Sequence, residues 1–256
     1  MKDLVSIITA SYNAEKYIAE AIKSVQAQTY SHWEMLITDD ASTDQTRRII
    51  ETFVEADKRI KLFKFNENQG PAKARNHSIA ESKGKFIAFL DADDQWLPEK
   101  LSLQLKVLKQ NKSSVCFSSY THIDKDGNDL NRMVSAIPRL SYKKLLKNNY
   151  IGNLTGMYDA SVLGKIYNPE LKKRQDWCLW LEALKRSEKP ALGFQKPLAK
   201  YRVLQDSISS HKFQLLKYNF WVYRKYLRFS FIKSSFYLLI FLKEYFFIRP
   251  KYISKQ

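Results

Sequence analysis

Short apolar runs alternate with amphipathic segments through the first half of the chain. Runs rich in β-branched and aromatic residues predict strands, and apolar residues spaced three or four positions apart predict helices. Strands separated by helices at this spacing are typical of an α/β fold, in which helices cover both faces of a mainly parallel sheet. The expected strands are residues 5–9, 32–40, 60–65, 86–90 and 115–119, and the expected helices are residues 14–27, 43–55, 71–82 and one that begins near Leu97.

The second half of the chain is less regular. Residues 124–128, DKDGN, predict a hairpin turn because Asp-Gly suits a positive φ. From that turn to about residue 210 the pattern indicates an α+β region that completes a site. Two aromatic helices are then expected over residues 214–229 and 229–252. The first should carry an apolar stripe made of Leu215, Tyr218, Val222, Tyr226 and Phe229.

Polar clusters follow three of the expected strands. ASYN ends the first strand, DDASTD ends the second, and DADD follows the run FIAFL. Ligands of parallel α/β sheets bind beyond the carboxyl ends of the strands. We therefore expect these clusters to converge on one crevice.

The DADD cluster places Asp91 and Asp93 on an extended exit segment. Unpaired carboxylates this close repel one another and resist desolvation. They can share a hard divalent cation, which prefers oxygen ligands and leaves positions for substrate phosphates. Salt bridges to lysine are the competing interpretation, and Asp94 is expected to cap the next helix.

Two further clusters suggest a nucleotide. Asp39, at a strand tip, can accept the N3–H of a uracil ring, while Tyr12 offers a stacking face. Asp44 is expected to cap the following helix. Arg75 lies one turn inside a helix that begins at Gly70-Pro71. It is either a solvated surface charge or a contact to a diphosphate or base carbonyl.

Composition narrows the possible partners. The 256-residue chain has a formal net charge of +17, which indicates an anionic partner: nucleic acid, anionic lipid or a phosphorylated substrate. Its length suggests one domain plus an appendage. Cys116 and Cys178 lack CxxC spacing, so a disulfide framework and structural zinc are not expected, and a reducing compartment fits. The start, MKDLVSIITASYN, does not read as a signal peptide.

The basic charge is concentrated at the C-terminus. Residues 211–256 hold ten Lys and Arg against one acid, Glu244, together with many aromatic residues. The longest uncharged stretch, Ser234–Leu242, has nine residues, whereas a spanning helix needs about 20. Lys and Arg among Phe, Tyr and Trp suit an anionic headgroup region. This segment predicts peripheral attachment to an anionic membrane surface without a transmembrane span.

The motifs together resemble the inverting nucleotide-sugar glycosyltransferases with a GT-A fold, often called family 2. The resemblance covers roughly residues 3–210. It implies that Tyr12 and Asp39 hold the uracil, that Asp91 approaches the ribose or the metal, and that Asp93 is the main ligand of Mn²⁺ or Mg²⁺. Ala10 and Arg75 are also implied in nucleotide-sugar binding. The matching motifs are VSIITASYN, DDASTD, NQGPAKARN, DADD, RQDWCLWLEAL and YRVLQDSIS.

The resemblance also implies a catalytic base. In the family, this base is the Asp of a Glu-Asp or Gln-Asp pair at the start of a helix. The corresponding residue in this sequence is Asp176. Inversion by direct displacement needs a carboxylate on the face opposite the leaving group, where it removes the acceptor proton. Without the family, Asp176 is a first-turn residue favoured by the helix dipole. Trp177 is expected beside the acceptor and Trp180 in the core.

One loop departs from the family pattern. The YR segment often continues with a His that helps to bind metal or diphosphate, and here the matching residue is Leu204. Arg202 and Ser209 are retained as phosphate-side candidates. His211 is either a substitute for the missing His or a solvated side chain.

These expectations combine into one function. Residues 1–210 form a GT-A domain, with a nucleotide-binding half (1–112) and an acceptor and catalytic-base half (113–210), and residues 211–256 attach to the membrane. The enzyme is expected to transfer a hexosyl or N-acetylhexosaminyl group from a UDP-sugar to a lipid-linked or oligosaccharide acceptor, with inversion. It would act at the cytoplasmic face of a bacterial membrane in cell-surface polysaccharide biosynthesis.

Three other functions were weighed. An inactive membrane-bound scaffold would not need Asp93 and Asp176 intact. A nucleic-acid-binding protein would carry its basic residues on strand faces or a recognition helix, whereas here they gather in the tail, so no nucleic acid is expected. A sugar nucleotidyltransferase should have a Gly-rich, Lys-containing loop after the first strand, and ASYNAEKY lacks one.

Overall fold

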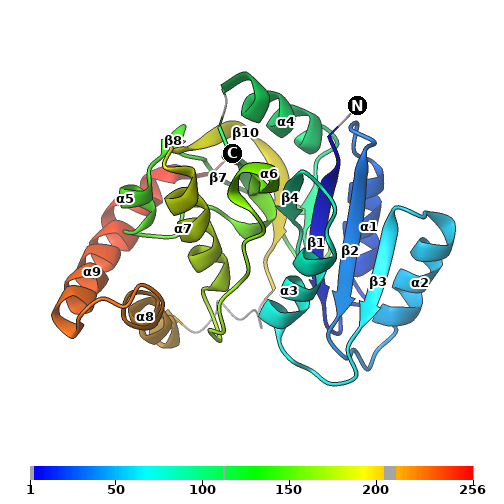
Figure 1. Ribbon diagram of the computed structural model, residues 1–256, viewed down its shortest axis with the longest axis horizontal. Helices are drawn as coiled ribbons and strands as arrows, with labels where there is room; N and C mark the ends of the chain where they lie inside the picture. The colour runs from blue at the N-terminus through cyan, green and yellow to red at the C-terminus, as the bar shows by residue number, and fades with distance from the viewer. Residues whose placement is uncertain (1–2, 112, 205–211, 256) are drawn as a thin grey trace.

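The computed structural model describes residues 3–111, 113–204 and 212–255, without the side chains of 212–215 (Figure 1). Its first half is built on four parallel strands in the order β4-β1-β2-β3. Val5 of β1 lies opposite Trp33 of β2 and Phe86 of β4. The strands are β1 (Val5–Ser11), β2 (Trp33–Asp39), β3 (Ile60–Lys64) and β4 (Phe86–Phe89).

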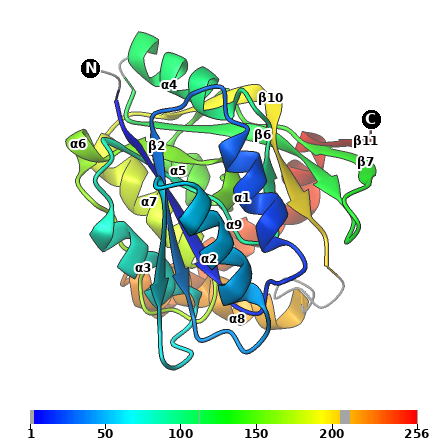
Figure 2. The ribbon, with the colours of Figure 1, turned by 90° about the vertical axis from the view of Figure 1, so that its right-hand side faces the viewer.

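Helices cover both faces of this sheet, as the alternating strand residues require. Ile7 of β1 packs in the core cluster that includes α1, α2 and α4, whereas Ile8 packs in the cluster that includes α3 and α7. Figure 2 shows α1 and α3 on opposite sides of the strands. The helices are α1 (Ile18–Gln26), α2 (Thr46–Ala56), α3 (Pro71–Glu81), α4 (Lys100–Asn111) and α7 (Gln175–Ser187). The predicted α/β architecture with helices on both faces is confirmed.

The second half extends the sheet with antiparallel strands. β9 (Met157–Asp159) runs antiparallel between β4 and β6 (Val115–Ile123), and β6 forms a hairpin with β7 (Asp129–Val134). A hairpin can only pair its strands antiparallel, whereas β10 (Ala191–Arg202) runs parallel to β6. The sheet is therefore mixed, and the predicted parallel pairing is found throughout the first half and again between β6 and β10. The remaining strands and short helices are β5 (Gln95–Trp96), β8 (Arg139–Leu140), α5 (Tyr142–Leu145), η1 (Asn153–Thr155) and α6 (Ala160–Leu163).

The predicted hairpin turn at residues 124–128 is confirmed. Asp124 Oδ1 accepts hydrogen bonds from the backbone nitrogens of Asp126 and Asn128, at 2.8 and 2.9 Å. Gly127 has a φ of +89°, a conformation that L side chains rarely adopt. The Asp-Gly pair therefore forms the turn for the physical reason that predicted it.

Helix α7 buries both of its tryptophans completely. Trp180 lies in the core as expected, so close to Gly156 that a Cβ there would sit 2.1 Å from its ring. Trp177 donates through Nε1 to the carbonyl oxygen of Leu145 at 2.9 Å, and its ring contacts Tyr223 and Phe241. The expectation that Trp177 flanks the acceptor is wrong, because the C-terminal segment covers that ring.

The C-terminal segment packs on α5 and α7, at the end of the molecule opposite α2 and β3 (Figure 1). Val222 of the expected stripe is buried, and so is Tyr223, which the 3.6-residue period had placed off the stripe. Tyr226 and Phe229 of the stripe pack against the same cluster. Residues Val222–Tyr226 form a π-helical turn, whose hydrogen bonds span five residues instead of four. The segment comprises α8 (Lys212–Trp221), η2 (Val222–Tyr226), α9 (Phe231–Lys243), η3 (Glu244–Ile248), η4 (Arg249–Tyr252) and β11 (Ile253–Lys255), which pairs with β7.

Within residues 3–111, 113–204 and 212–255, every helix is too short or too polar to span a bilayer.

Lys100, at the start of α4, is a buried amine that predicts a pH-dependent stability. Its Nζ donates to Gln104 Oε1 at 2.6 Å and lies 4.1 Å from the centroid of the Trp96 ring. Burial lowers the pKa of Lys100 to about 7 from a usual value of 10.5. Between pH 7 and 10.5 this amine is protonated in the unfolded chain but largely neutral in the folded chain. The free energy of unfolding therefore falls as the pH drops from 10.5 towards 7.

Replacing this amine should stabilise the protein at neutral pH. We expect Lys100→Met to raise the free energy of unfolding by about 1–3 kcal/mol at pH 7, since each pKa unit is worth about 1.4 kcal/mol, and to change it little near pH 10.5. Urea unfolding at both pH values measures the effect. Lys106→Met, at an exposed position of the same helix, is the control. An equal effect at both pH values would contradict this explanation.

Candidate active site

The end of β2 is organised by two buried aspartates. Asp39 accepts hydrogen bonds from Ser42 N at 3.0 Å, from Ser11 Oγ at 3.3 Å and from the Ser42 hydroxyl, and it forms an ion pair with Arg47 Nε at 2.5 Å. These donors use both carboxylate oxygens of Asp39. A uracil N3–H would have to displace one of them, and that contact stays a prediction.

Asp40 is a residue that the sequence interpretation missed. Its two carboxylate oxygens accept from the backbone nitrogens of Gln69 and Gly70, at 2.7 and 2.8 Å. Gly70 has a φ of +89° and precedes Pro71, the first residue of α3. Asp40 therefore fixes the start of α3 against the tip of β2, and the direct DD repeat was the only local signal for it.

Ala10 and Tyr12 lie at the tip of β1. Ala10 pairs with Thr38 of β2, and the Tyr12 side chain is 50% exposed. The Tyr12 ring is thus accessible for stacking, as the prediction requires. Asp44 Oδ1 accepts from Thr46 N at 2.9 Å, at the first residue of α2, so Asp44 satisfies a free donor at that helix start, although the N-cap residue itself is Gln45.

Arg75 of α3 brings three acidic side chains together. Its Nη2 forms an ion pair with Asp91 Oδ1 at 2.5 Å. Burial lowers the pKa of Arg75, but Asp91, then Asp176 and Asp93, raise it more, so the net shift is upward. Asp91 of the DADD loop thus pairs directly with Arg75, and the charges of Asp93 and of Asp176 from α7 act on the same guanidinium, so these distant motifs lie in one region.

The Asp93 carboxyl is well suited to a cation. Burial and the charge of Asp91 raise the pKa of Asp93 to about 6. Within residues 3–111, 113–204 and 212–255, no other residue donates a hydrogen bond to its carboxylate, and Asp94 Oδ2 is buried without a partner. Such an excess of oxygen ligands and negative charge fits Mg²⁺ or Mn²⁺. The described residues contain no group of three His, Cys, Asp or Glu arranged to hold a metal ion.

Arg202 packs against the DADD loop from the protein interior and is not exposed at the predicted donor site. Its side chain has no exposed surface, and its backbone nitrogen donates to Asp94 Oδ1 at 2.9 Å. The residue therefore supports the loop that carries the aspartates, and a contact with the donor phosphate would require its guanidinium to leave its present partners. Those partners are the backbone oxygens of Asp93, Asp124 and Lys125, the carboxylate of Glu20 and the ring of Tyr17.

The loop after Arg202 is only partly described. Leu204 is partly buried at its start. Ser209 and His211, the other two candidates in this region, lie outside the described residues, and their roles stay predictions.

Asp176 lies in the first turn of α7, which follows Arg174 in a left-handed conformation with a φ of 69°. Asn149 Nδ2 donates to Asp176 Oδ2 at 2.7 Å. Asn153 Nδ2 donates to Asp91 Oδ1 at 3.2 Å. Both asparagines belong to one short stretch, and the sequence interpretation missed them, although three asparagines within residues 148–153 were a signal.

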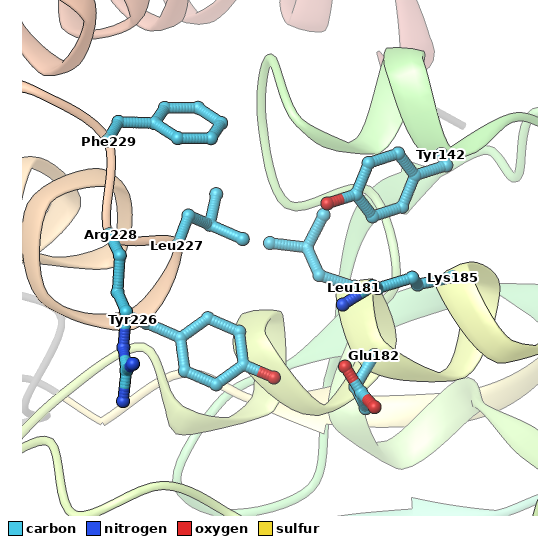
Figure 3. Close-up of a pocket in the computed structure, with 8 residues that line it drawn as sticks. All are labelled: Tyr142, Leu181, Glu182, Lys185, Tyr226, Leu227, Arg228 and Phe229. Atoms are coloured by element: carbon cyan, nitrogen blue, oxygen red, sulfur yellow. The ribbon is translucent and has the colours of Figure 1, made fainter.

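A separate cavity of about 450 Å³ lies between α5, α7 and the C-terminal segment (Figure 3). The Tyr142 and Tyr226 hydroxyl groups both point towards α7 in this view. None of the residues that line the cavity belongs to the predicted site at the strand tips, so the cavity and that site are distinct. The lining residues are Tyr142, Leu181, Glu182, Lys185, Tyr226, Leu227, Arg228 and Phe229.

The comparisons with known proteins agree on one protein family. The model of glycosyl transferase family 2 matches residues 6–165. TuaG of Bacillus subtilis (strain 168), a glycosyltransferase whose name assigns it to teichuronic acid biosynthesis, is 41% identical over 234 residues, which cover 91% of this chain and 92% of that protein. WfgD of Escherichia coli, named a UDP-Glc:α-D-GlcNAc-diphosphoundecaprenol β-1,3-glucosyltransferase, is 42% identical over 214 residues, 84% of this chain and 83% of that protein.

Solved structures agree on the fold. Staphylococcus aureus TarS residues 1–349 in complex with UDP-GlcNAc superposes with a TM-score of 0.71 at 21% identity, covering 96% of this chain and 73% of that one. The mannosyltransferase PcManGT from Pyrobaculum calidifontis, in complex with GDP-Man and Mn²⁺, has a TM-score of 0.71 at 17% identity, covering 98% and 72%. The fold is therefore that of these sugar-nucleotide transferases. With the family model and these relatives in agreement, the chain belongs to glycosyl transferase family 2 and is a glycosyltransferase.

Proposed function

We propose that this glycosyltransferase moves a hexosyl or N-acetylhexosaminyl group from a UDP-sugar to an acceptor hydroxyl, with a divalent cation and with inversion. The observation that supports this most is the gathering of Asp91, Asp93 and Asp176 around Arg75. One site then offers carboxylates for a metal and a separate carboxylate for a proton. Uridine as the base is supported by the exposed Tyr12 ring and by the UDP complexes of the TarS fold.

The proposed reaction is a single displacement. Asp93, with Asp91, would hold Mn²⁺ or Mg²⁺, which stabilises negative charge on the departing diphosphate when it is bound. Asp176 accepts the proton of the acceptor hydroxyl while that oxygen bonds to the anomeric carbon. The bond from this carbon to the UDP oxygen breaks, and its electron pair leaves with UDP. Arg75 keeps the proposed metal ligands, Asp91 and Asp93, close to the proposed base, Asp176.

The acceptor is proposed from the relatives. WfgD is named for an acceptor linked to diphosphoundecaprenol, and TuaG for teichuronic acid biosynthesis. We therefore propose a lipid-linked or oligosaccharide acceptor in bacterial cell-surface polysaccharide biosynthesis. The catalytic domain would comprise residues 1–210, and residues 211–256 would attach to the membrane.

A membrane role for the C-terminal segment is supported by its outer face. Exposed fractions reach 83% for Ile232 and 70% for Phe247. Lys233 and Lys243 lie in the same helix, α9. Exposed aromatic and basic side chains side by side suit the headgroup region of an anionic bilayer. We call this surface the apolar tail face and propose that it attaches the enzyme peripherally to the cytoplasmic leaflet; it consists of Phe231, Ile232, Phe236, Leu239, Phe246 and Phe247.

Polar substitutions on the apolar tail face should release the enzyme from lipid. We expect Ile232→Ser combined with Phe236→Ser and Phe247→Ser to lower binding to phosphatidylglycerol vesicles at least about tenfold, because each exposed side chain contributes apolar burial. Vesicle sedimentation at low salt measures this. Leu130→Ser, at an exposed apolar residue of β7, is the control. Equal vesicle binding by wild type and triple variant would contradict the attachment.

A screen of sugar-nucleotide donors tests the proposed reaction in a single experiment. The full-length protein is incubated with UDP-, GDP- and dTDP-sugars in Mn²⁺, and release of the nucleoside diphosphate is followed. Turnover confined to the uridine donors is the expected result. Turnover of GDP-sugars alone would contradict the assigned base, and no turnover of any donor would favour the inactive-scaffold alternative.

A further inference from the structure

One stretch of the chain forms hydrogen bonds with both the proposed base and one of the proposed metal ligands. Residues 146–153, which follow α5, contain Asn149 and Asn153. Asn149 donates to Asp176 at 2.7 Å, and Asn153 donates to Asp91 at 3.2 Å. The placement of this stretch therefore determines where the proposed base lies relative to the proposed metal ligands.

The Asn149 amide is held in one orientation. Its Oδ1 accepts a hydrogen bond from the backbone nitrogen of Ile151 at 3.2 Å. The NH₂ group, and not the carbonyl oxygen, must then face Asp176. This bond engages Oδ2 of Asp176. In the part of the chain that the structure describes, no residue donates to Oδ1, which is therefore the oxygen that can accept a proton from the acceptor.

The C-terminal segment holds the same stretch from behind. The Arg249 guanidinium donates to the backbone oxygen of Asn149 and lies 5.4 Å from the centroid of the Tyr150 ring. Glu244, which is 3% exposed, accepts from the Tyr150 hydroxyl at 2.5 Å and pairs with Lys144. The single acid of the basic tail is thus used to fix this stretch.

We propose that Asn149 is a positioning residue for Asp176, and that Arg249 of the C-terminal segment keeps Asn149 in place. The proposal rests on the role of Asp176 as the base. A hydrogen bond from an amide that is itself held in place fixes the rotamer of the Asp176 carboxylate. The C-terminal segment then contributes to catalysis as well as to the proposed membrane attachment.

The charged neighbours of Asp176 matter for testing this role by pH. Arg75 from α3 and Arg174 from the start of α7 both interact with it, as does the thiol of Cys178. Burial raises the pKa of Cys178, so this thiol stays neutral through the working range. Neither arginine titrates there. A shift of the acid limb of the pH profile therefore reports on Asp176 and on whatever stands at position 149.

Asn149→Asp separates positioning from a merely structural role. The new carboxylate keeps an oxygen that can accept from Ile151 N, but it replaces the donor to Asp176 with a like charge. We expect kcat at pH 7 to fall about 10- to 100-fold, with the KM for the UDP-sugar changed less than about twofold. We also expect the acid limb of the kcat profile to move up by about one pH unit or more. Asn111→Asp, at the exposed end of α4, should leave both unchanged.

Arg249→Gln tests the contribution of the tail. We expect a drop in kcat with little change in KM, and almost no further drop when it is combined with Asn149→Asp, because both changes act through position 149. Lys251→Gln removes the same charge from an exposed side chain of the same short helix and is the matched control. Independent, fully additive losses would overturn the role assigned to Arg249.

The outcomes also separate this inference from the proposed function. A wild-type enzyme that transfers sugar, together with an Asn149→Asp enzyme of unchanged kcat and pH profile, would overturn the positioning role alone. An Asp176→Asn enzyme with full transfer activity would remove the base itself, and with it the proposed mechanism.

Discussion

Asp176→Asn is expected to abolish sugar transfer while leaving UDP binding intact. The carboxamide has nearly the shape of the carboxylate but cannot take the proton of the acceptor hydroxyl. General-base catalysis is worth about 10²–10⁴-fold, so we expect kcat to fall by about 10³-fold. The affinity for UDP should stay within about twofold of wild type, because the interactions proposed for UDP binding do not involve Asp176.

The measurement pairs a transfer assay with calorimetric titration of UDP in Mn²⁺. Glu182→Gln is the matched control, because Glu182 lies on the same helix and its partner is Arg186 at 2.8 Å, on the side away from the site. Retained transfer in Asp176→Asn would rule out the residue as base. Loss of UDP binding together with transfer would place Asp176 in the donor site instead.

Asp93→Asn is expected to have a comparably large effect by a different route. Replacing the carboxylate that we propose as the main metal ligand should remove Mn²⁺-dependent turnover and weaken Mn²⁺ binding in the presence of UDP. A neutral amide oxygen is a poorer ligand for a hard cation than a carboxylate. Mn²⁺ titration followed by electron paramagnetic resonance, with and without UDP, measures the binding directly.

The same variant should stabilise the metal-free protein. The pKa of Asp93 is raised to about 6 by burial and by Asp91, against a usual value of 3.8. The cost of ionising Asp93 in the folded state therefore appears as the pH rises above 3.8 and is complete above pH 6. Asn avoids this cost, so we expect a gain on the order of 1–3 kcal/mol at pH 7 in EDTA.

Thermal unfolding in EDTA compares this variant with Asp126→Asn, which changes an exposed carboxylate of the hairpin turn. A lower melting temperature for Asp93→Asn than for wild type would contradict the electrostatic interpretation of the site. Higher stability with lower activity would mark Asp93 as a residue kept for binding rather than for folding.

The convergence of the motifs could be predicted because it depends on local pattern and one topological rule. Short apolar runs predicted β1, β2 and β4, and parallel strands place their carboxyl ends at one edge. Asp39, Asp91 and Asp93 follow directly. The position of Asp176 came from the family resemblance, since α7 belongs to the irregular half of the chain, where no strand-end rule applies.

The contacts that complete the site are non-local, and no periodicity reveals them. Asn153 and Asp91 are 62 residues apart in the chain, Asn149 and Asp176 are 27 apart, and Arg249 and Asn149 are 100 apart. Each partner is an ordinary polar residue in its own stretch. The burial of Arg202 was hidden for the same reason, because its partners come from two separate loops and from α1.

In the C-terminal segment, the apolar spacing predicted the correct type of element but not every residue of its buried face. The periodicity of residues 214–229 predicted an amphipathic helix, and its inner face does pack on α7 through Val222 and Tyr223. Tyr226 and Phe229 of the predicted stripe pack on the same core cluster, and Tyr223 joins them within the π-helical turn. Backbone hydrogen bonding that departs from the α-helix cannot be read from apolar spacing, and it brought Tyr223 onto Trp177.

A crystal structure of the full chain with UDP and Mn²⁺ tests the central claim most directly. We predict one ion bound between the Asp93 carboxylate and the diphosphate of UDP, with the uracil ring on Tyr12 and the Asp176 carboxylate open towards the acceptor side. UDP bound at the strand tips with no ion beside Asp93, or an ion held elsewhere, would contradict the metal-dependent mechanism.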